Sequence, residues 1–117
     1  MKTIREIYRI GYGPSSSHTM GPRKASEIFL NRHPEAVAFE VILYGSLAAT
    51  GKGHLTDVAI LDTLQPHATV EIVWKPSVFL PFHPNGMTFR SKNSSGEVTD
   101  EWTVFSVGGG ALAEEGK

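Results

Sequence analysis

The sequence of 117 residues contains no cysteine. Without thiols the chain cannot form a disulfide, present a thiolate nucleophile, ligate zinc through sulfur or hold an iron–sulfur cluster by itself. It also lacks an excess of positive charge: 11 Lys and Arg are balanced by 12 Asp and Glu, which gives a net charge of −1. The basic residues are scattered without a run, so the charge pattern gives no reason to expect nucleic acid as a partner.

Long apolar stretches are absent as well. No segment approaches the length of a transmembrane helix, and residues 1–10 mix charged with apolar side chains instead of forming the apolar block of a signal peptide. We therefore expect a cytoplasmic protein that makes no membrane contact. The length and the 40% of apolar residues predict a single soluble domain with one core.

Local patterns predict helices early in the chain and strands late. Helices are expected over residues 4–8, 22–32 and 55–64, of which the last is apolar nearly all round and therefore mostly buried. Strands are expected over residues 39–44, 69–74, 87–92 and 102–107. The last two strands should form an antiparallel hairpin across the turn at residues 94–96. From Gly108 onward no packing pattern is visible. This order predicts an α+β fold with a mostly antiparallel sheet of about four strands and two or three helices.

The first candidate site is the segment Ser15-Ser16-Ser17-His18-Thr19, which immediately precedes the predicted helix 22–32. Hydroxyl side chains at such a point can cap a helix and leave its first backbone N–H groups facing a small anion. The imidazole of His18 adds a group that can move a proton. Helix capping alone is the plainer alternative, but four hydroxyls with a histidine exceed what one cap requires, and this favours a functional site.

The second candidate is the segment Gly51-Lys52-Gly53-His54, a glycine-rich turn before the predicted helix 55–64. It is not a nucleotide-binding P-loop, because the spacing from Gly45 is one residue too long and no Ser or Thr follows the lysine. A helix dipole lowers the pKa of a histidine at its N-terminus, so His54 would be neutral and able to accept a proton near pH 7. Taken alone, this motif slightly favours the alternative of a glycine loop required only for close packing.

Other chemistry has weaker support. The five histidines do not fall at metal-ligand spacings, so no metal site is predicted. A hydrolase built from Ser17, His54 and Asp57 would lack the Gly-x-Ser-x-Gly elbow. Asp57 lies about one helical turn after His54 and is better interpreted as a support for that loop. His83 is interpreted as structural.

Both candidate segments also resemble a known family. Gly13-Pro14-Ser15-Ser16-Ser17-His18-Thr19-Met20-Gly21-Pro22 and Gly51-Lys52-Gly53-His54-Leu55-Thr56-Asp57-Val58-Ala59 closely resemble the β region of iron–sulfur-dependent L-serine dehydratases. Asn85-Gly86-Met87 and Ser106-Val107-Gly108-Gly109-Gly110 resemble later segments of that region, so the resemblance extends over essentially the whole chain. Compared with longer family members the segment between Leu64 and Asn85 is short, and we expect any helix carried there to be missing.

The resemblance implies an ammonia-lyase of amino-acid catabolism. Enzymes of this family eliminate water from L-serine, and the aminoacrylate that forms becomes pyruvate and ammonia. A [4Fe-4S] cluster acts as the Lewis acid on the substrate hydroxyl while a base removes the Cα proton. The cluster is held by cysteines of an α region, so residues 1–117 are expected to be a β domain, a fragment or a subunit that lacks the α region and is inactive alone. The implied partners are the α region, L-serine and further copies of the chain in a homo-oligomer.

The resemblance also implies roles for individual residues. His54 is the expected base, and His18 is its partner or a substrate positioner. The groups expected to bind the substrate are Ser16, Ser17, Thr19 and Gly53. Those expected to support the loop are Gly51 and Asp57.

A second hypothesis follows from the fold. The β region is similar to the allosteric substrate-binding domain of some phosphoglycerate dehydrogenases. A chain with that fold can instead be a regulatory module that senses serine or another small anion and carries no catalytic residue.

Overall fold

The computed structural model describes residues 16–51, 56–108 and 110–114, and the helix expected over residues 4–8 lies outside them. The described elements follow one another as α2 (Ser16–Arg32), β1 (Ala38–Tyr44), α3 (Gly45–Gly51), α4 (Thr56–Leu64), β2 (Thr69–Lys75), β3 (Gly86–Lys92), β4 (Val98–Gly108) and β5 (Ala111–Ala113). None of the described helices has the length and apolar character that a membrane crossing requires.

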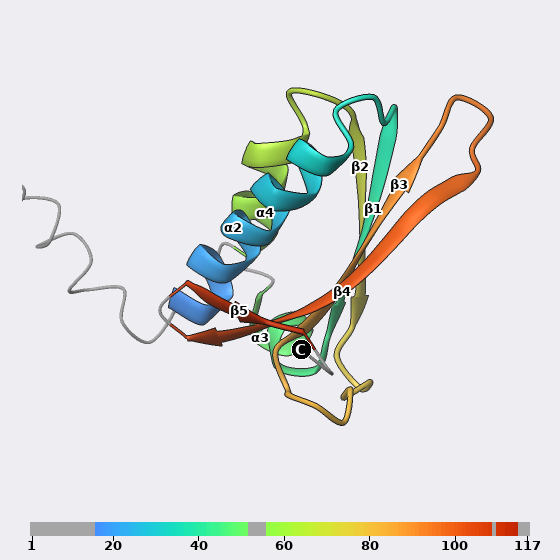
Figure 1. The fold of residues 1–117 in the computed structure, drawn as a ribbon. Helices are drawn as coiled ribbons and strands as arrows, with labels where there is room; N and C mark the ends of the chain where they lie inside the picture. Colours follow the sequence, from blue (N-terminus) through green and yellow to red (C-terminus); the bar gives the residue numbers. More distant parts are fainter. Residues whose placement is uncertain (1–15, 52–55, 109, 115–117) are drawn as a thin grey trace, which may run out of the picture.

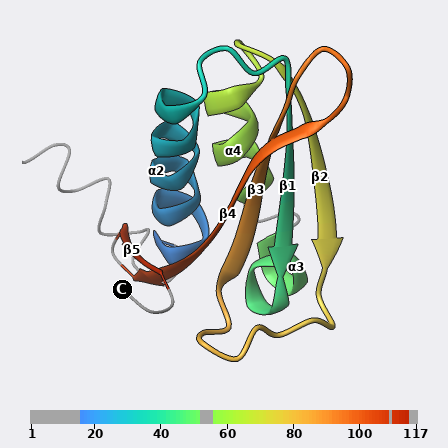
Figure 2. The same ribbon diagram turned by 45° about the vertical axis from the view of Figure 1, so that its right-hand side comes forward.

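The strands form one five-stranded mixed sheet in the order β2-β1-β3-β4-β5. β1 and β2 are parallel and are joined by a crossover through α3 and α4, whereas the other neighbours are antiparallel. α2 and α4 lie side by side on one face of the sheet (Figure 1; Figure 2). The predicted α+β fold is therefore confirmed, together with the β3–β4 hairpin, whose turn contains Gly96 at a φ of 82°.

The core lies between these two helices and the sheet. Along β1 the side chains of Phe39, Val41 and Leu43 are buried and alternate with side chains of the opposite face. In β3 Met87 and Phe89 stand opposite Leu43 and Val41 and continue the same layer. The helices and the other strands complete the core with Ala25, Phe29, Leu47, Ala48, Ile60, Leu64, Trp102 and Val104.

The first long helix begins earlier than the sequence pattern predicts. α2 starts at Ser16 and continues through Pro22, where a helix was expected to begin. Proline has no N–H, so the helical hydrogen bond to the carbonyl of residue 18 is lost. The extension is stabilised by tertiary packing, because α2 contacts both β4 and β5 and Gly21 lies directly against Ser106 of β4.

Two helical segments also differ from their prediction. No helix was predicted for residues 45–51, but they form α3, which buries Leu47 and Ala48. α4 was expected to be buried nearly all round, yet only one face is: Thr56, Ala59, Ile60 and Leu64 are buried. Val58, in the first turn of α4, is 43% exposed, because the helix lies at the surface of its layer and turns this side to solvent.

The end of the described chain has a packing role that the sequence did not reveal. After Gly108 and Gly110, at φ values of 112° and 85°, the chain reverses and Ala111–Ala113 pair with β4 as β5. Leu112 packs against the core, and the Nε1–H of Trp102 donates a hydrogen bond to the carboxylate of Glu114. The expectation of an unpacked ending is therefore wrong for this segment. The glycines make the reversal possible because they adopt positive φ without strain.

Candidate functional site

The described parts of both candidate motifs lie at one end of the molecule. α2 and α4 begin at this end, β1 and β2 finish there, and β3 begins there (Figure 1; Figure 2). We call it the motif end and define it by residues 16–21, 45–51, 56–58, 76–85, 106–108 and 110. The arrangement follows from the topology, because α2 and α4 each run away from this end and are each followed by a parallel strand that returns to it.

Residues 16–19 of the hydroxyl–histidine segment form the first turn of α2 rather than a loop before it, whereas Ser15 lies outside the described residues. The first four N–H groups of an α-helix have no partner within the helix. In α2 these groups include those of residues 16–18, so backbone donors and the hydroxyl and imidazole groups occur on the same residues. Thr19 is half-buried, whereas the side chains of Ser16, Ser17 and His18 lie outside the described part of the structure.

Of the second motif, the structure describes only the residues on either side of its centre, Gly51 at one border and Thr56 onward at the other. Gly51 is the last residue of α3, while Gly53 and His54 lie outside the described residues. At the other border, the Asp57 carboxylate accepts a hydrogen bond of 3.0 Å from the backbone N–H of Val58. A carboxylate in the first turn complements the positive end of a helix dipole, and the support of the preceding loop expected from Asp57 stays a prediction.

The two helices that begin at the motif end are in direct contact. α2 and α4 pack against each other along their length, and Arg23 of α2 lies 3.9 Å from the Asp62 carboxylate of α4. Since both helices run in the same direction, their positive dipole ends lie at the same end of the molecule. This geometry suits a small anionic ligand between the two starts. The structure thus brings the two motif segments to one end, and the roles of the individual residues remain predictions.

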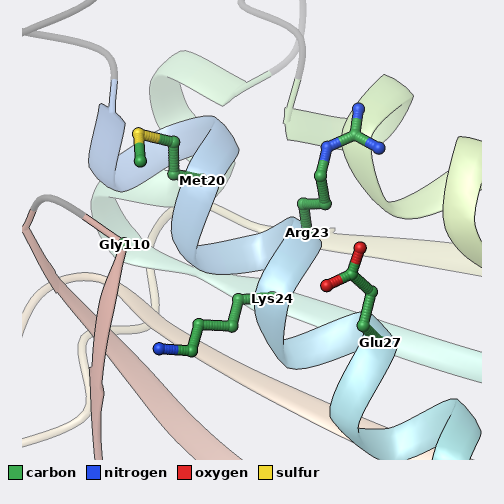
Figure 3. Close-up of a pocket in the computed structure, with 5 residues that line it drawn as sticks. All are labelled: Met20, Arg23, Lys24, Glu27 and Gly110. Carbon is green, nitrogen blue, oxygen red and sulfur yellow. The ribbon is translucent and has the colours of Figure 1, made fainter. Parts of the chain in front are cut away.

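A pocket that the sequence reading missed lies beside the first motif. It has a volume of about 400 Å³ between α2 and β5 and is lined by Met20, Arg23, Lys24, Glu27 and Gly110 (Figure 3). The four helical residues share one face because each lies three residues from one of the others and four residues from another, which is the signal that could have revealed them. Two cations and one carboxylate line this pocket, and no residue predicted for the site does.

The histidines that the structure describes in detail are engaged in structural contacts. The Nδ1 atom of His83 accepts a hydrogen bond of 3.1 Å from the backbone N–H of Asn85, which agrees with the interpretation of His83 as structural. His33 lies at the opposite end of α2, where its Nε2 is 2.7 Å from the Asp100 carboxylate. Within residues 16–51, 56–108 and 110–114, no group of three or more His, Cys, Asp or Glu could hold a metal ion.

Comparison with known proteins gives a consistent result. The chain matches the family model described as "Serine dehydratase beta chain" over residues 3–70 and 62–117. It is 36% identical to the L-serine dehydratase of Mycobacterium bovis over 152 residues, which covers 97% of this chain and 33% of that protein. It is 34% identical to the L-serine dehydratase TdcG of Escherichia coli over 150 residues, covering 94% of this chain and 33% of TdcG. The chain therefore spans about a third of the length of these relatives.

The same comparisons locate a difference in length. The alignment with the Mycobacterium bovis protein extends over 152 residues although this chain has 117, so that relative carries residues that this chain lacks. The two matched pieces of the family model meet and overlap at residues 62–70, which contain the end of α4 and the start of β2. The break agrees with the shortening expected after Leu64.

Proposed function

This chain belongs to the family of serine dehydratase β chains, and we propose that it is the β component of an enzyme that converts L-serine to pyruvate and ammonia. The observation that carries the proposal is the family match over nearly the whole chain. The position of both motifs at one end of a small α+β domain supports it, because a substrate site shared with a partner needs such an exposed end. A cytoplasmic location and a homo-oligomeric assembly are parts of the same proposal.

An iron–sulfur cluster does not fit the residues of this chain. The sequence has no cysteine, and the described residues contain no alternative group of metal ligands. We therefore assign the [4Fe-4S] cluster of the enzymes that this chain resembles to the α region, and we derive no step from it here. The contribution of this chain is limited to binding the substrate and moving a proton.

Substrate binding is proposed for the start of α2. The N–H groups of residues 16–18 in the first turn of α2 and the hydroxyls of Ser16, Ser17 and Thr19 can donate hydrogen bonds to the carboxylate of L-serine, with Gly53 allowing close approach of the neighbouring turn. A carboxylate at a helix N-terminus is stabilised further by the dipole. Fixing this group orients the Cα–H bond of the substrate relative to the base.

Proton removal is proposed for His54, with His18 as its partner or as a substrate positioner. A neutral imidazole accepts the Cα proton, and the electron pair of the Cα–H bond forms the double bond to Cβ. The bond between Cβ and the hydroxyl oxygen breaks, hydroxide leaves and takes up a proton to depart as water, and aminoacrylate remains. In the sequence His54 comes three residues before Asp57, which lies in the first turn of α4, and His18 lies in the first turn of α2. The positive end of a helix dipole favours the neutral, proton-accepting form of such a histidine.

The test is a reconstituted enzyme in which His18 and His54 are each replaced by Asn. Pyruvate formation and serine binding are measured with the α polypeptide present. We expect the base variant to lose turnover by about 10²- to 10⁴-fold while its serine affinity is retained. The matched control is His67→Asn, which alters an exposed histidine in the turn between α4 and β2 and should leave turnover unchanged. Normal turnover of both variants with altered serine cooperativity would overturn the proposal in favour of a sensing module.

A further inference from the structure

Exposed apolar side chains are concentrated at the motif end. Among the described residues, eight large hydrophobic side chains are exposed, and only Val37 and Val98 lie at the opposite end. Those at the motif end are Met20, Val58, Val78, Phe79, Phe82 and Val107. Single exposed apolar residues are ordinary on protein surfaces, but a concentration of them marks an interaction site.

The densest part of this surface is the connection between β2 and β3, residues 76–85, which we call the aromatic loop. Phe79 is 59% exposed, Phe82 is 45% exposed and Val78 is 42% exposed. The loop contains no Asp, Glu, Lys or Arg, so its only titratable side chain is that of His83. An uncharged surface of this kind does not suit nucleic acid or an anionic membrane, both of which are attracted by basic residues.

The aromatic loop is held in place by the domain. The ring of Phe79 lies over Gly45, so closely that a Cβ at that position would be 2.7 Å from the ring. The rings of Phe82 and Phe105 are in contact, with their centroids 4.8 Å apart. Each Phe therefore rests on the domain with one side and is open to solvent on the other. A surface fixed in this way loses little conformational entropy when a partner binds.

We propose that the aromatic loop is the docking surface for the cluster-bearing α region, with Phe79 and Phe82 as the anchor residues. The inference rests on the proposed function. The relatives carry two thirds of their length outside the part that this chain matches, and we take that remaining part as the occupant of the surface. The loop lies at the same end as the starts of α2 and α4, so a partner that covers the motifs also reaches the loop. Exposed aromatic residues are the side chains most often found as anchors of protein interfaces.

The test measures the affinity of the full chain for the α polypeptide, meaning the cysteine-containing part of the serine dehydratase from the same organism. Phe79→Ser and Val78→Ser are compared with Val37→Ser and Val98→Ser, which alter valines exposed to 48% and 50% at the opposite end. We expect Phe79→Ser to weaken binding by about 10-fold or more, as for an interface anchor. Val78→Ser should weaken it less, and the two controls should bind like the wild type.

Two further readouts separate docking from folding and from catalysis. The unfolding midpoint of each free variant shows whether the chain still folds. Because Phe79 also covers Gly45, Val78→Ser is the second test if Phe79→Ser unfolds. At saturating α polypeptide, kcat should equal the wild-type value, since the substitution changes binding and not chemistry.

The inference is overturned if Phe79→Ser and Val78→Ser bind the α polypeptide as tightly as the wild type does. It is also overturned if the two control variants lose as much affinity as these two. If these substitutions instead abolish self-association of the chain or its binding to phosphatidylcholine vesicles, the surface belongs to a second copy or to a lipid surface, and the inference is likewise wrong. A wild-type mixture that forms no pyruvate from serine counts against the proposed function. An active mixture that is insensitive to the aromatic loop counts only against the docking surface.

Discussion

Replacing Gly21 with Ala tests whether close packing of α2 on β4 sets the position of the first motif. A Cβ added to Gly21 would lie 2.0 Å from the Oγ and 2.7 Å from the Cβ of Ser106. Rotating the Ser106 hydroxyl relieves the first contact but not the second, because the Cβ is fixed by the backbone of β4. Either the start of α2 or the end of β4 must therefore move.

The expected change in the free energy of unfolding on Gly21→Ala follows from two opposing effects. Glycine to alanine within a helix stabilises by about 1 kcal/mol, whereas overpacking a buried contact costs about 1–3 kcal/mol or more. Because the contact involves a backbone-fixed atom, we expect the overpacking term to dominate and the free energy of unfolding to fall by about 1–2 kcal/mol. For a chain of this size that corresponds to a decrease of roughly 5–10 °C in the unfolding midpoint. Pyruvate formation should fall as well, since residues 16–19 move with the helix.

A series of companion variants makes the test specific. Gly21→Ala with Ser106→Ala keeps the contact with the Cβ, whereas Gly21→Ala with Ser106→Gly removes both atoms and leaves the Cα at 3.5 Å as the nearest atom of that residue. The second pair should recover stability that the first does not. Ser106→Ala alone should leave the free energy of unfolding unchanged or raise it by about 1 kcal/mol, because the buried Ser106 hydroxyl has no hydrogen-bond partner within the described structure.

Chemical denaturation of these variants gives the coupling energy between the two positions as a double-mutant cycle. A favourable coupling of about 1 kcal/mol or more is expected for the pair that removes both atoms. The reasoning is refuted if Gly21→Ala is as stable as the wild type. It is also refuted if the effects of Gly21→Ala and Ser106→Gly simply add.

Three further predictions concern stability. Phe29→Ala removes a fully buried ring from the core and should lower the free energy of unfolding by about 3–5 kcal/mol; a loss below 1 kcal/mol in denaturant would contradict its central position. Hydrogen bonding from His33 and from the backbone lowers the pKa of Asp100 below its ordinary value of 3.8, so the stabilisation is present above that value and is lost as pH falls through the lowered pKa. Asp100→Asn should therefore reduce stability at neutral pH and flatten its decline in acid, and unchanged curves between pH 2 and 7 would oppose this. Asp57→Ala removes the acceptor of the Val58 N–H and should cost about 0.5–1 kcal/mol in thermal or chemical unfolding, whereas an unaltered midpoint would show that the contact adds nothing.

The parts of the fold that the sequence predicted well are those that depend on local periodicity. β1 and β2 were located almost to the residue, β1 because residues 39–44 are a short apolar run and β2 because Val70, Ile72 and Trp74 alternate with polar neighbours. The β3–β4 hairpin followed from its turn residues. A local hydrophobic pattern is present in the sequence before any tertiary contact forms, so these elements could be predicted from it.

The parts that were missed depend on distant contacts. Pro22 indicates a helix start when only its neighbours are considered, and the true start at Ser16 depends on packing of Gly21 against Ser106 far along the chain. β5 consists of three residues, and it exists because two glycines at positive φ return the chain to β4. Neither a three-residue strand nor a glycine reversal produces a periodic pattern that can be recognised in advance.

The candidate site was predictable in its residue types but not in its geometry. The hydroxyl–histidine and glycine–histidine segments were each recognisable, and the crossover between the parallel strands β1 and β2 is what brings both to one end. The helical conformation of residues 16–19 was not foreseen. It changes the chemistry proposed for them, because the N–H groups of residues 16–18, in the first turn of the helix, now belong to residues that also carry hydroxyl or imidazole groups.

This chain lacks residues that its relatives carry, and the position of the missing residues decides whether the proposed site can still form. The break at residues 62–70 lies where α4 ends and β2 begins, which is the opposite end of the molecule from the motifs. The backbone there is closed by hydrogen bonds from Gln65 to the carbonyl of Leu61 and from His67 and Ala68 to that of Leu64, so the connection is completed locally. β2 then pairs with β1 in an unbroken parallel register through Lys75, at the motif end. Because the connection closes before the strand begins, residues can be lost there without moving the starts of α2 and α4. The shortened chain is thus compatible with the proposed function, and any change caused by the missing segment should appear at the opposite end.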